Sequence, residues 1–181
     1  QDYPSSLMGA IALLKQSELD AQWIQQSGEK DLSLERWNEL SDLPLLFEVS
    51  NKWEALNALE IAEFMEQDML IKGNNDEYQR WQEFKEKTAR LILPLTYPEA
   101  MDISDPIALD YANYADMKHW ELAPYNAFIL HEKGIPFAFT TDGLKSEKEL
   151  LKALRQLKDK GLSEQDILGA FTATPAEWLV L

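Results

Sequence analysis

Four short apolar runs, each followed by a segment with helical periodicity, constrain the fold of this chain more than any other feature. The runs are LPLLFEV, DMLIK, RLILPL and IPFAFT, at 43–49, 68–72, 90–95 and 135–140. Parallel strands need a long connection back across the sheet, usually a helix. The alternation therefore predicts an α/β fold with about four parallel strands and flanking helices.

Periodicity leaves two architectures open for these strands. One is a small open, doubly wound sheet, and the other is four consecutive units of an eight-stranded barrel. The 181 residues fall short of the about 250 residues of a complete barrel. No G-x-G-x-x-G or Walker-type glycine loop follows any of the runs, so the sequence does not support a nucleotide site.

Helical segments are expected on both sides of the strands. A helix from Ser5 to about residue 26 and a second from near Ser33 form a lead-in, 1–43, before the four β/α units, 44–160. Two closing helices, in 161–181, complete what we predict to be a single domain, 1–181.

Several local signals place the later helices. A helical region from Ile107 to Lys133 is expected to break before Pro124. Ser146 and Glu149 form a capping-box pattern. Gly161 is expected to end that helix. Ser163 is expected to open the first closing helix, and the second is expected to begin at Thr174, Pro175 and Glu177.

Composition excludes several classes of partner. The 32 acidic and 17 basic residues give a net charge of −15, which disfavours nucleic acid and anionic membrane surfaces. No apolar run approaches the roughly 20 residues of a membrane span, so membrane insertion is not expected. Cysteine is absent, which removes disulfides and thiolate chemistry. The first residue, Gln1, suggests a processed product or an excised segment, and the compartment of this soluble chain stays open.

The strand ends carry motifs in a distinctive order: FEV at 47–49, IKG at 71–73 and FTTDG at 139–143, with GLSEQDILGAFTATPAEWLVL at the end. This order resembles the amidohydrolase superfamily, especially its imidazolonepropionase-like metal-dependent hydrolases, over nearly the whole chain. The resemblance implies the carboxyl-terminal half of a TIM-type (β/α) barrel, with the remaining half barrel as partner. Some bacterial proteins similar to the first segment are exported, which includes the periplasm among the expected locations.

The resemblance also assigns candidate site residues. In that family the fifth and sixth strands end in histidines that bind metal, and the eighth ends in G-T-D, whose Asp binds metal or acts as base. Asp142 stands at the position of that Asp, whereas Glu48 and Lys72 replace the two histidines. The resemblance thus implies Asp142 as catalytic residue or metal ligand and Glu48 as metal ligand. It implies no cofactor for this chain, and zinc or another divalent metal for an intact active relative.

Each candidate also has a purely structural interpretation. The TTDG sequence around Asp142 is typical of a turn, and Glu48 suits a cap or an ion pair. Lys72 suits a structural cation, since a charged ammonium only donates hydrogen bonds. We predict that the Lys72 ammonium lies within about 4 Å of at least one of the two carboxylates and replaces the metal electrostatically.

Other polar and aromatic residues are assigned structural roles. Asp76 and Glu77 have the spacing of a helix N-terminus. His119 and His131 fall in or between helices rather than at strand ends. The tryptophans expected at helix-core positions are Trp53, Trp81 and Trp120.

Three functions are compatible with these patterns. The favoured one is a catalytically degenerate domain or fragment of an amidohydrolase-like protein. The second is an active metal-dependent hydrolase of amide or cyclic imide C–N bonds, once joined to the missing half barrel. The third is a non-catalytic open-sheet binding domain. Unpaired strand edges further predict a homodimer, unless the other half barrel covers them.

Overall fold

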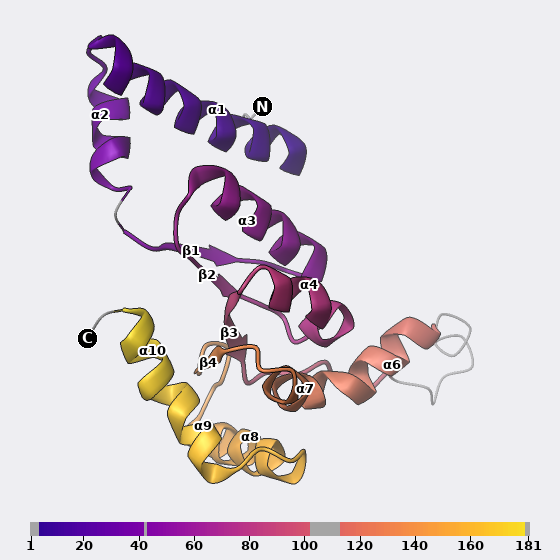
Figure 1. Ribbon diagram of the computed structural model, residues 1–181. Coiled ribbons are helices and arrows are strands. Elements are labelled where there is room, and N and C mark those ends of the chain that lie inside the picture. Colours follow the sequence, from indigo (N-terminus) through magenta and orange to yellow (C-terminus); the bar gives the residue numbers. More distant parts are fainter. Residues whose placement is uncertain (1–3, 42, 102–112, 180–181) are drawn as a thin grey trace.

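Four parallel strands form the centre of the protein in the computed structural model, which describes residues 4–41, 43–101 and 113–179 (Figure 1). The strands are β1 (Leu45–Glu48), β2 (Met69–Lys72), β3 (Arg90–Pro94) and β4 (Phe137–Thr140). They form one sheet in the order β1-β2-β3-β4. The predicted α/β fold with parallel strands joined by helices is confirmed, and the arrangement is that of a partial (β/α) barrel.

Helices precede, connect and follow these strands. Their bounds are α1 (Leu7–Ser27), α2 (Leu32–Glu39), α3 (Lys52–Met65), η1 (Glu77–Arg80), α4 (Trp81–Glu86), α6 (Tyr114–Leu122), η2 (Ala123–Tyr125), α7 (Asn126–Glu132), α8 (Glu147–Asp159), α9 (Glu164–Phe171) and α10 (Ala173–Trp178). The expected helical lead-in and closing helices are both present. In Figure 1, α1 lies alongside α3. Helices α9 and α10, at the end of the chain, pack against β4.

Local sequence signals explain most of the helix boundaries. The Ser6 hydroxyl accepts a hydrogen bond from the Gly9 amide and so caps α1. Ser146 caps α8 in the same way, while the Glu149 carboxylate accepts from the Lys145 amide, one residue before the cap. Gly161 has a φ of 114°, which ends that helical segment with a backbone conformation suited to glycine.

Two expected boundaries differ in detail, and a third lies outside the described residues. Helix α2 is capped by Asp31, two residues before Ser33, because its carboxylate accepts from two backbone amides. Helix α10 begins at Ala173, so Pro175 is its third residue rather than its first. The region expected from 107 is described only from 113. Within the described part it breaks at η2, which contains Pro124, as predicted.

The two faces of the sheet have different surroundings. On one face Ile71, Leu93 and Phe139 belong to the buried core under the helices. On the other face the register aligns residues in rows, because paired residues of neighbouring parallel strands point the same way. The rows are Leu46, Leu70 and Arg90, then Glu48, Lys72, Ile92 and Ala138, then Pro94 and Thr140. Leu46 in the first row is 64% exposed, so β1 is poorly covered on this face.

Within the described ranges, no helix is long and apolar enough to cross a membrane.

Candidate functional site

Three candidate residues meet at the carboxyl end of the sheet. Glu48 and Lys72 are the last residues of β1 and β2, and they occupy paired positions in the register. Asp142 follows β4 by two residues. Parallel strands bring their carboxyl ends to one edge, which is also where (β/α) barrels place their active sites.

Lys72 forms ion pairs with both carboxylates. Its Nζ lies 2.7 Å from Glu48 Oε1 and also donates to Asp142 Oδ2. The Lys72 side chain is 18% exposed, against 73% for Glu48 and 66% for Asp142. The predicted ion pair, with at least one of the two carboxylates, is therefore present, and both carboxylates take part in it.

The ion pairs fix the charge of the lysine. Hydrogen bonds to Asp142 and then to Glu48 raise the pKa of the Lys72 ammonium above its ordinary value. The same contact with Lys72 lowers the pKa of the Asp142 carboxyl. Lys72 consequently stays protonated at neutral pH and has no lone pair for a metal or for nucleophilic attack.

This set of side chains does not fit a divalent metal. A cation bound between Glu48 and Asp142 would stand where the Lys72 ammonium stands, and a positive charge there repels it. Within the described ranges, no three His, Cys, Asp or Glu side chains gather as a metal-binding group. The site residues of this chain thus provide two carboxylates and one fixed positive charge.

A tight turn holds Asp142 in position. Its amide donates to the Thr140 hydroxyl at 3.1 Å, and the Leu144 amide donates to the Thr141 carbonyl at 3.1 Å. Gly143 has a φ of 83°, a left-handed conformation that favours glycine. The turn interpretation of the TTDG sequence therefore accounts for the backbone, and the ion pair accounts for the side chain.

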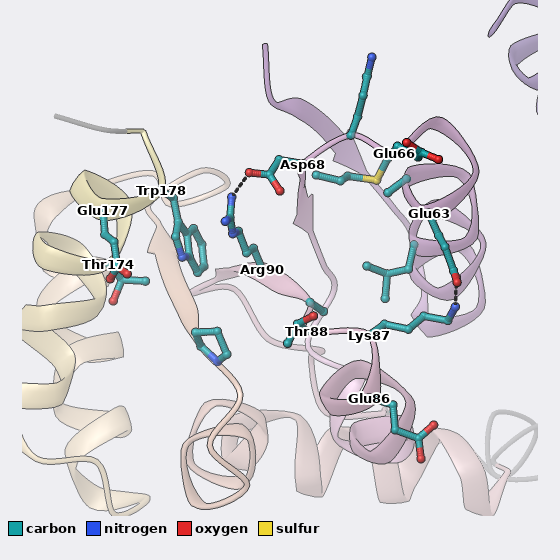
Figure 2. A pocket seen from close by; sticks show the side chains of 16 residues that line it. Glu63, Glu66, Asp68, Glu86, Lys87, Thr88, Arg90, Thr174, Glu177 and Trp178 are labelled. Carbon is teal, nitrogen blue, oxygen red and sulfur yellow. Dashed lines mark hydrogen bonds and ion pairs between the residues drawn. The ribbon is translucent and has the colours of Figure 1, made fainter. Parts of the chain in front are cut away.

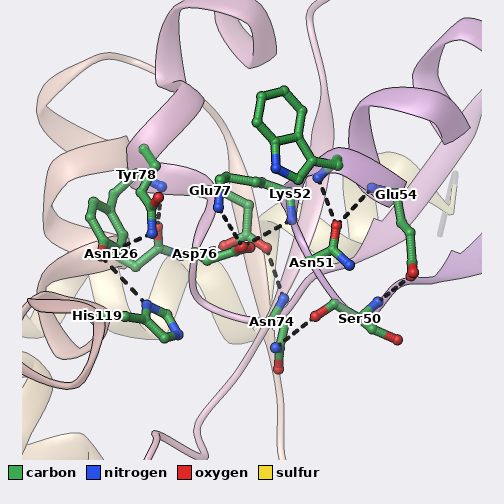
Figure 3. Close-up of polar contacts among 12 residues, drawn as sticks. Ser50, Asn51, Lys52, Glu54, Asn74, Asp76, Glu77, Tyr78, His119 and Asn126 are labelled. Carbon is green, nitrogen blue, oxygen red and sulfur yellow. Dashed lines mark hydrogen bonds and ion pairs between the residues drawn. The ribbon is translucent and has the colours of Figure 1, made fainter. Parts of the chain in front are cut away.

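A buried polar cluster lies in the loop that follows Lys72 (Figure 3). Glu77 is fully buried, with Oε1 accepting from the Asn74 amide at 2.8 Å and Oε2 from Asn126 Nδ2 at 2.7 Å. Burial raises the pKa of the Glu77 carboxyl, against the effect of these hydrogen bonds. The sequence correctly indicated a helix N-terminus here, but it gave no sign that the glutamate is buried.

The cluster joins loops from different parts of the sheet. Asn75 Nδ2 donates to the carbonyl of Pro94, the last residue of β3, at 2.9 Å, and to the carbonyl of Thr96, just beyond it, at 3.0 Å. Asn126 Oδ1, at the start of α7, accepts from the Tyr78 amide at 2.8 Å. These bonds hold the loop after β2 in place beside Lys72. The glycine at position 73 is the sequence signal for this close packing, because a Cβ there would overlap the Glu77 carboxylate.

Histidines and tryptophans lie elsewhere. His119 and His131 are on α6 and α7, where His119 Nδ1 is 3.4 Å from the Tyr78 hydroxyl. Trp53 and Trp120 are 52% and 46% exposed, so their expected core positions were wrong. For Trp53 the reason is its place at the start of α3, where the Arg80 guanidinium lies 4.4 Å from its ring.

The opposite end of the sheet has a hollow of about 1050 Å³ (Figure 2). Its walls carry the ion pairs Arg90–Asp68, at 2.9 Å, and Lys87–Glu63, at 2.6 Å. It lies where β2 and β3 begin, away from the three strand-end residues. In (β/α) barrels this end contributes to stability rather than to catalysis, so we do not regard it as the functional site.

Comparisons with known proteins are informative for the fold. No protein-family model and no curated protein sequence matches the chain. A crystal structure of an amidohydrolase from Thermotoga maritima MSB8 is similar, with a TM-score of 0.71 and 19% sequence identity. The similarity covers 98% of this chain and 46% of that chain, so this chain spans less than half its length. At this identity the comparison shows the partial-barrel fold alone.

Proposed function

We propose that this chain is the carboxyl-terminal half of an amidohydrolase-like barrel in which Lys72 takes the place of the catalytic metal. The observation that carries the proposal is the pairing of one ammonium with both Glu48 and Asp142. In this proposal the strand-end residues form a structural ion-pair cluster. The segment itself is then catalytically silent and serves as a binding or scaffolding domain.

The chemistry of Asp142 supports a silent site. A hydrolase of this kind needs a Lewis acid to activate water and a base to accept its proton. Asp142 Oδ2 is engaged by Lys72, and the lowered pKa of this carboxyl makes it a weak base. The Lys72 ammonium occupies the place between the two carboxylates where a Lewis-acidic metal would bind.

The partner in this proposal is the remaining half barrel of the parent polypeptide. Among the described residues, β1 and β4 each pair with a strand on one side only. The exposed Leu46 lies on the face that would turn toward the interior of a closed barrel. A half barrel supplied by the same polypeptide would pair both edges and cover this face. Residues 1–181 would then form a single domain that packs against it.

A second candidate function is an active metal-dependent hydrolase of amide or cyclic imide C–N bonds, formed when the other half supplies further ligands. The resemblance of the Thr141–Gly143 motif favours it. It requires Lys72 to leave both carboxylates. A His-x-His pair at the end of a first strand, encoded upstream in the parent gene, would support this alternative.

Elemental analysis of the purified chain tests the proposal. After incubation with zinc and dialysis, we expect no retained zinc, because Lys72 holds the carboxylates that a metal would use. Lys72→His serves as a comparison, because it restores a side chain that can bind metal. One zinc per wild-type chain, lost in Asp142→Asn, would contradict the proposal.

A further inference from the structure

An apolar groove of about 520 Å³ runs between helices α8 and α9. Its apolar walls are formed by Leu150, Leu151, Leu154, Ile167, Leu168 and Phe171. At its rim Lys158 Nζ, on α8, lies 2.5 Å from Glu164 Oε1, on α9. An exposed apolar surface with a charged rim is typical of a groove that receives an amphipathic helix.

Both helices carry more apolar surface than the core uses. On α8, Leu157 is fully buried, whereas Leu151 is 52% exposed. On α9, Ala170 is buried, whereas Leu168 is 63% exposed. A helix that only covers a sheet needs a single apolar stripe. The two additional leucines therefore indicate a second contact, on the side away from the core.

The groove lies at the β4 edge of the sheet. Phe171 of α9 packs against Phe139 of β4, with ring centroids 5.3 Å apart. Strand β4 pairs with β3, and no described strand pairs with its other side. In Figure 1, α8 and α9 lie at one end of the molecule and α1 at the other. Because the helices of a (β/α) barrel form an outer ring, the next helix of the ring would lie beside α8 and α9.

The helices at the two ends of the chain exclude a second copy as the source of that helix. Leu14 of α1 and Trp37 of α2 line one small apolar space with Leu45 and Phe47 of β1, so these helices cover the β1 edge. Helix α9 covers the β4 edge in the same way. In a barrel each strand is followed by one helix of the outer ring. Joining β4 to the β1 of a second copy would bring α9 and the α1 of that copy into one position.

We propose that the groove between α8 and α9 receives one amphipathic helix of the remaining half barrel, namely the helix that follows the strand paired with β4. This inference rests on the proposed function, which names that half barrel as the partner. The helix places apolar residues at i, i+3 or i+4, and i+7 into the groove. An acidic side chain beside this stripe meets Arg155 at the rim. The partner that fits has helices only between its own strands.

Leu168→Cys tests whether the groove is covered, because residues 1–181 contain no cysteine of their own. The variant is made in residues 1–181 and in the full-length parent polypeptide, and labelling by iodoacetamide is followed by peptide mass spectrometry. We expect the new thiol to react at least about tenfold more slowly in the full-length protein, where the helix covers it. Met117→Cys is the control and should react equally in both, since Met117 is 49% exposed on α6, which extends away from the sheet (Figure 1).

Leu168→Glu provides an independent measurement. In residues 1–181 the position is exposed, so the melting temperature should change by less than about 2 °C. In the full-length protein the carboxylate would be buried in an apolar contact, so the melting temperature should fall by about 4 °C or more.

The outcomes separate this docking site from the proposed function. Equal labelling of the new thiol in both proteins, or equal effects of Leu168→Glu on both, would overturn the docking site alone. Labelling of residues 1–181 that slows as the protein concentration rises would identify a second copy as the occupant and would also overturn it. Zinc retained through Asp142 would overturn the proposed silent site and leave the docking result unchanged. A parent gene that encodes no further half barrel would overturn both.

Discussion

Lys72 and Glu48 occupy paired positions on adjacent parallel strands, and 2.7 Å separates Lys72 Nζ from Glu48 Oε1. Asp142 reaches the same ammonium from beyond β4. The lysine therefore links the first and last strands of the sheet through their carboxyl ends. Three charges that are far apart in the sequence become one cluster because the strands are parallel.

Replacing Lys72 with Met keeps most of the stem and removes the charge. We expect the melting temperature to fall by a few degrees near neutral pH, because two carboxylates then face each other without a cation. Lys148→Met, in the exposed first turn of α8, is the matched control and should change little.

The pH dependence of the Lys72→Met effect follows from the directions of two pKa shifts. The pKa of Asp142 is lowered in the fold, so its stabilising contribution is present above its unfolded pKa and lost as pH falls through the folded pKa. The pKa of Lys72 is raised, so its contribution is lost as pH rises through that folded pKa. The difference between wild type and variant should thus shrink in acid and in strong alkali. A difference that is constant across the range would count against the ion pair.

Gly73→Ala tests the packing of the loop after β2. The new Cβ would overlap Glu77 Oε1, whose carboxylate is buried and held by Asn74 and Asn126. We expect a loss of about 1–3 kcal/mol in the free energy of unfolding. The loss should be smaller in a Glu77→Ala background, where the overlapping atoms are gone. Additive effects in this double-mutant cycle would show that the two residues do not compete for space.

Much of the fold could be predicted from the sequence, because alternating apolar runs and helical periods report local geometry directly. The turn at Thr140–Gly143 and the cap at Ser146 are equally local. The ion pairs of Lys72 could be predicted only because parallel strand ends converge. The burial of Glu77 could not, since its partner Asn126 lies 49 residues away and depends on how α7 packs. The exposure of Trp53 likewise depends on which side of α3 remains uncovered.

Glu77→Gln removes the charge from the buried cluster. Burial raises the pKa of Glu77, so the folded chain holds this proton more tightly than the unfolded chain does. The stabilising contribution of the protonated Glu77 carboxyl is fully present below the pKa that Glu77 has in the unfolded chain. It is lost as pH rises through the higher pKa that Glu77 has in the folded chain. The stability advantage of wild type over Glu77→Gln should therefore decrease with rising pH, measured by denaturant unfolding. Glu86→Gln, on the exposed side of α4, is the control and should show no such trend. If Glu77 stayed ionised throughout, the advantage of wild type over Glu77→Gln would not change with pH, and this result would count against the raised pKa.

The open sheet face predicts self-association of the isolated chain. Leu46 is exposed on the edge strand β1, so a second copy can cover it when the other half barrel is absent. Sedimentation should show dimers that become weaker in Leu46→Glu. Leu19→Glu, at an exposed position of α1, is the control. A stable wild-type monomer at high concentration would contradict the expectation.

The proposed function depends on Lys72 sharing its charge between the two carboxylates at the mouth of the half barrel. NMR titration of the Asp142 side-chain carboxyl carbon in wild type and in Lys72→Met measures this directly. We expect an Asp142 pKa below the ordinary aspartate value in wild type and a clear rise in the variant, because Lys72 is the main cause of the lowering. An Asp142 pKa that is the same in both proteins would contradict it.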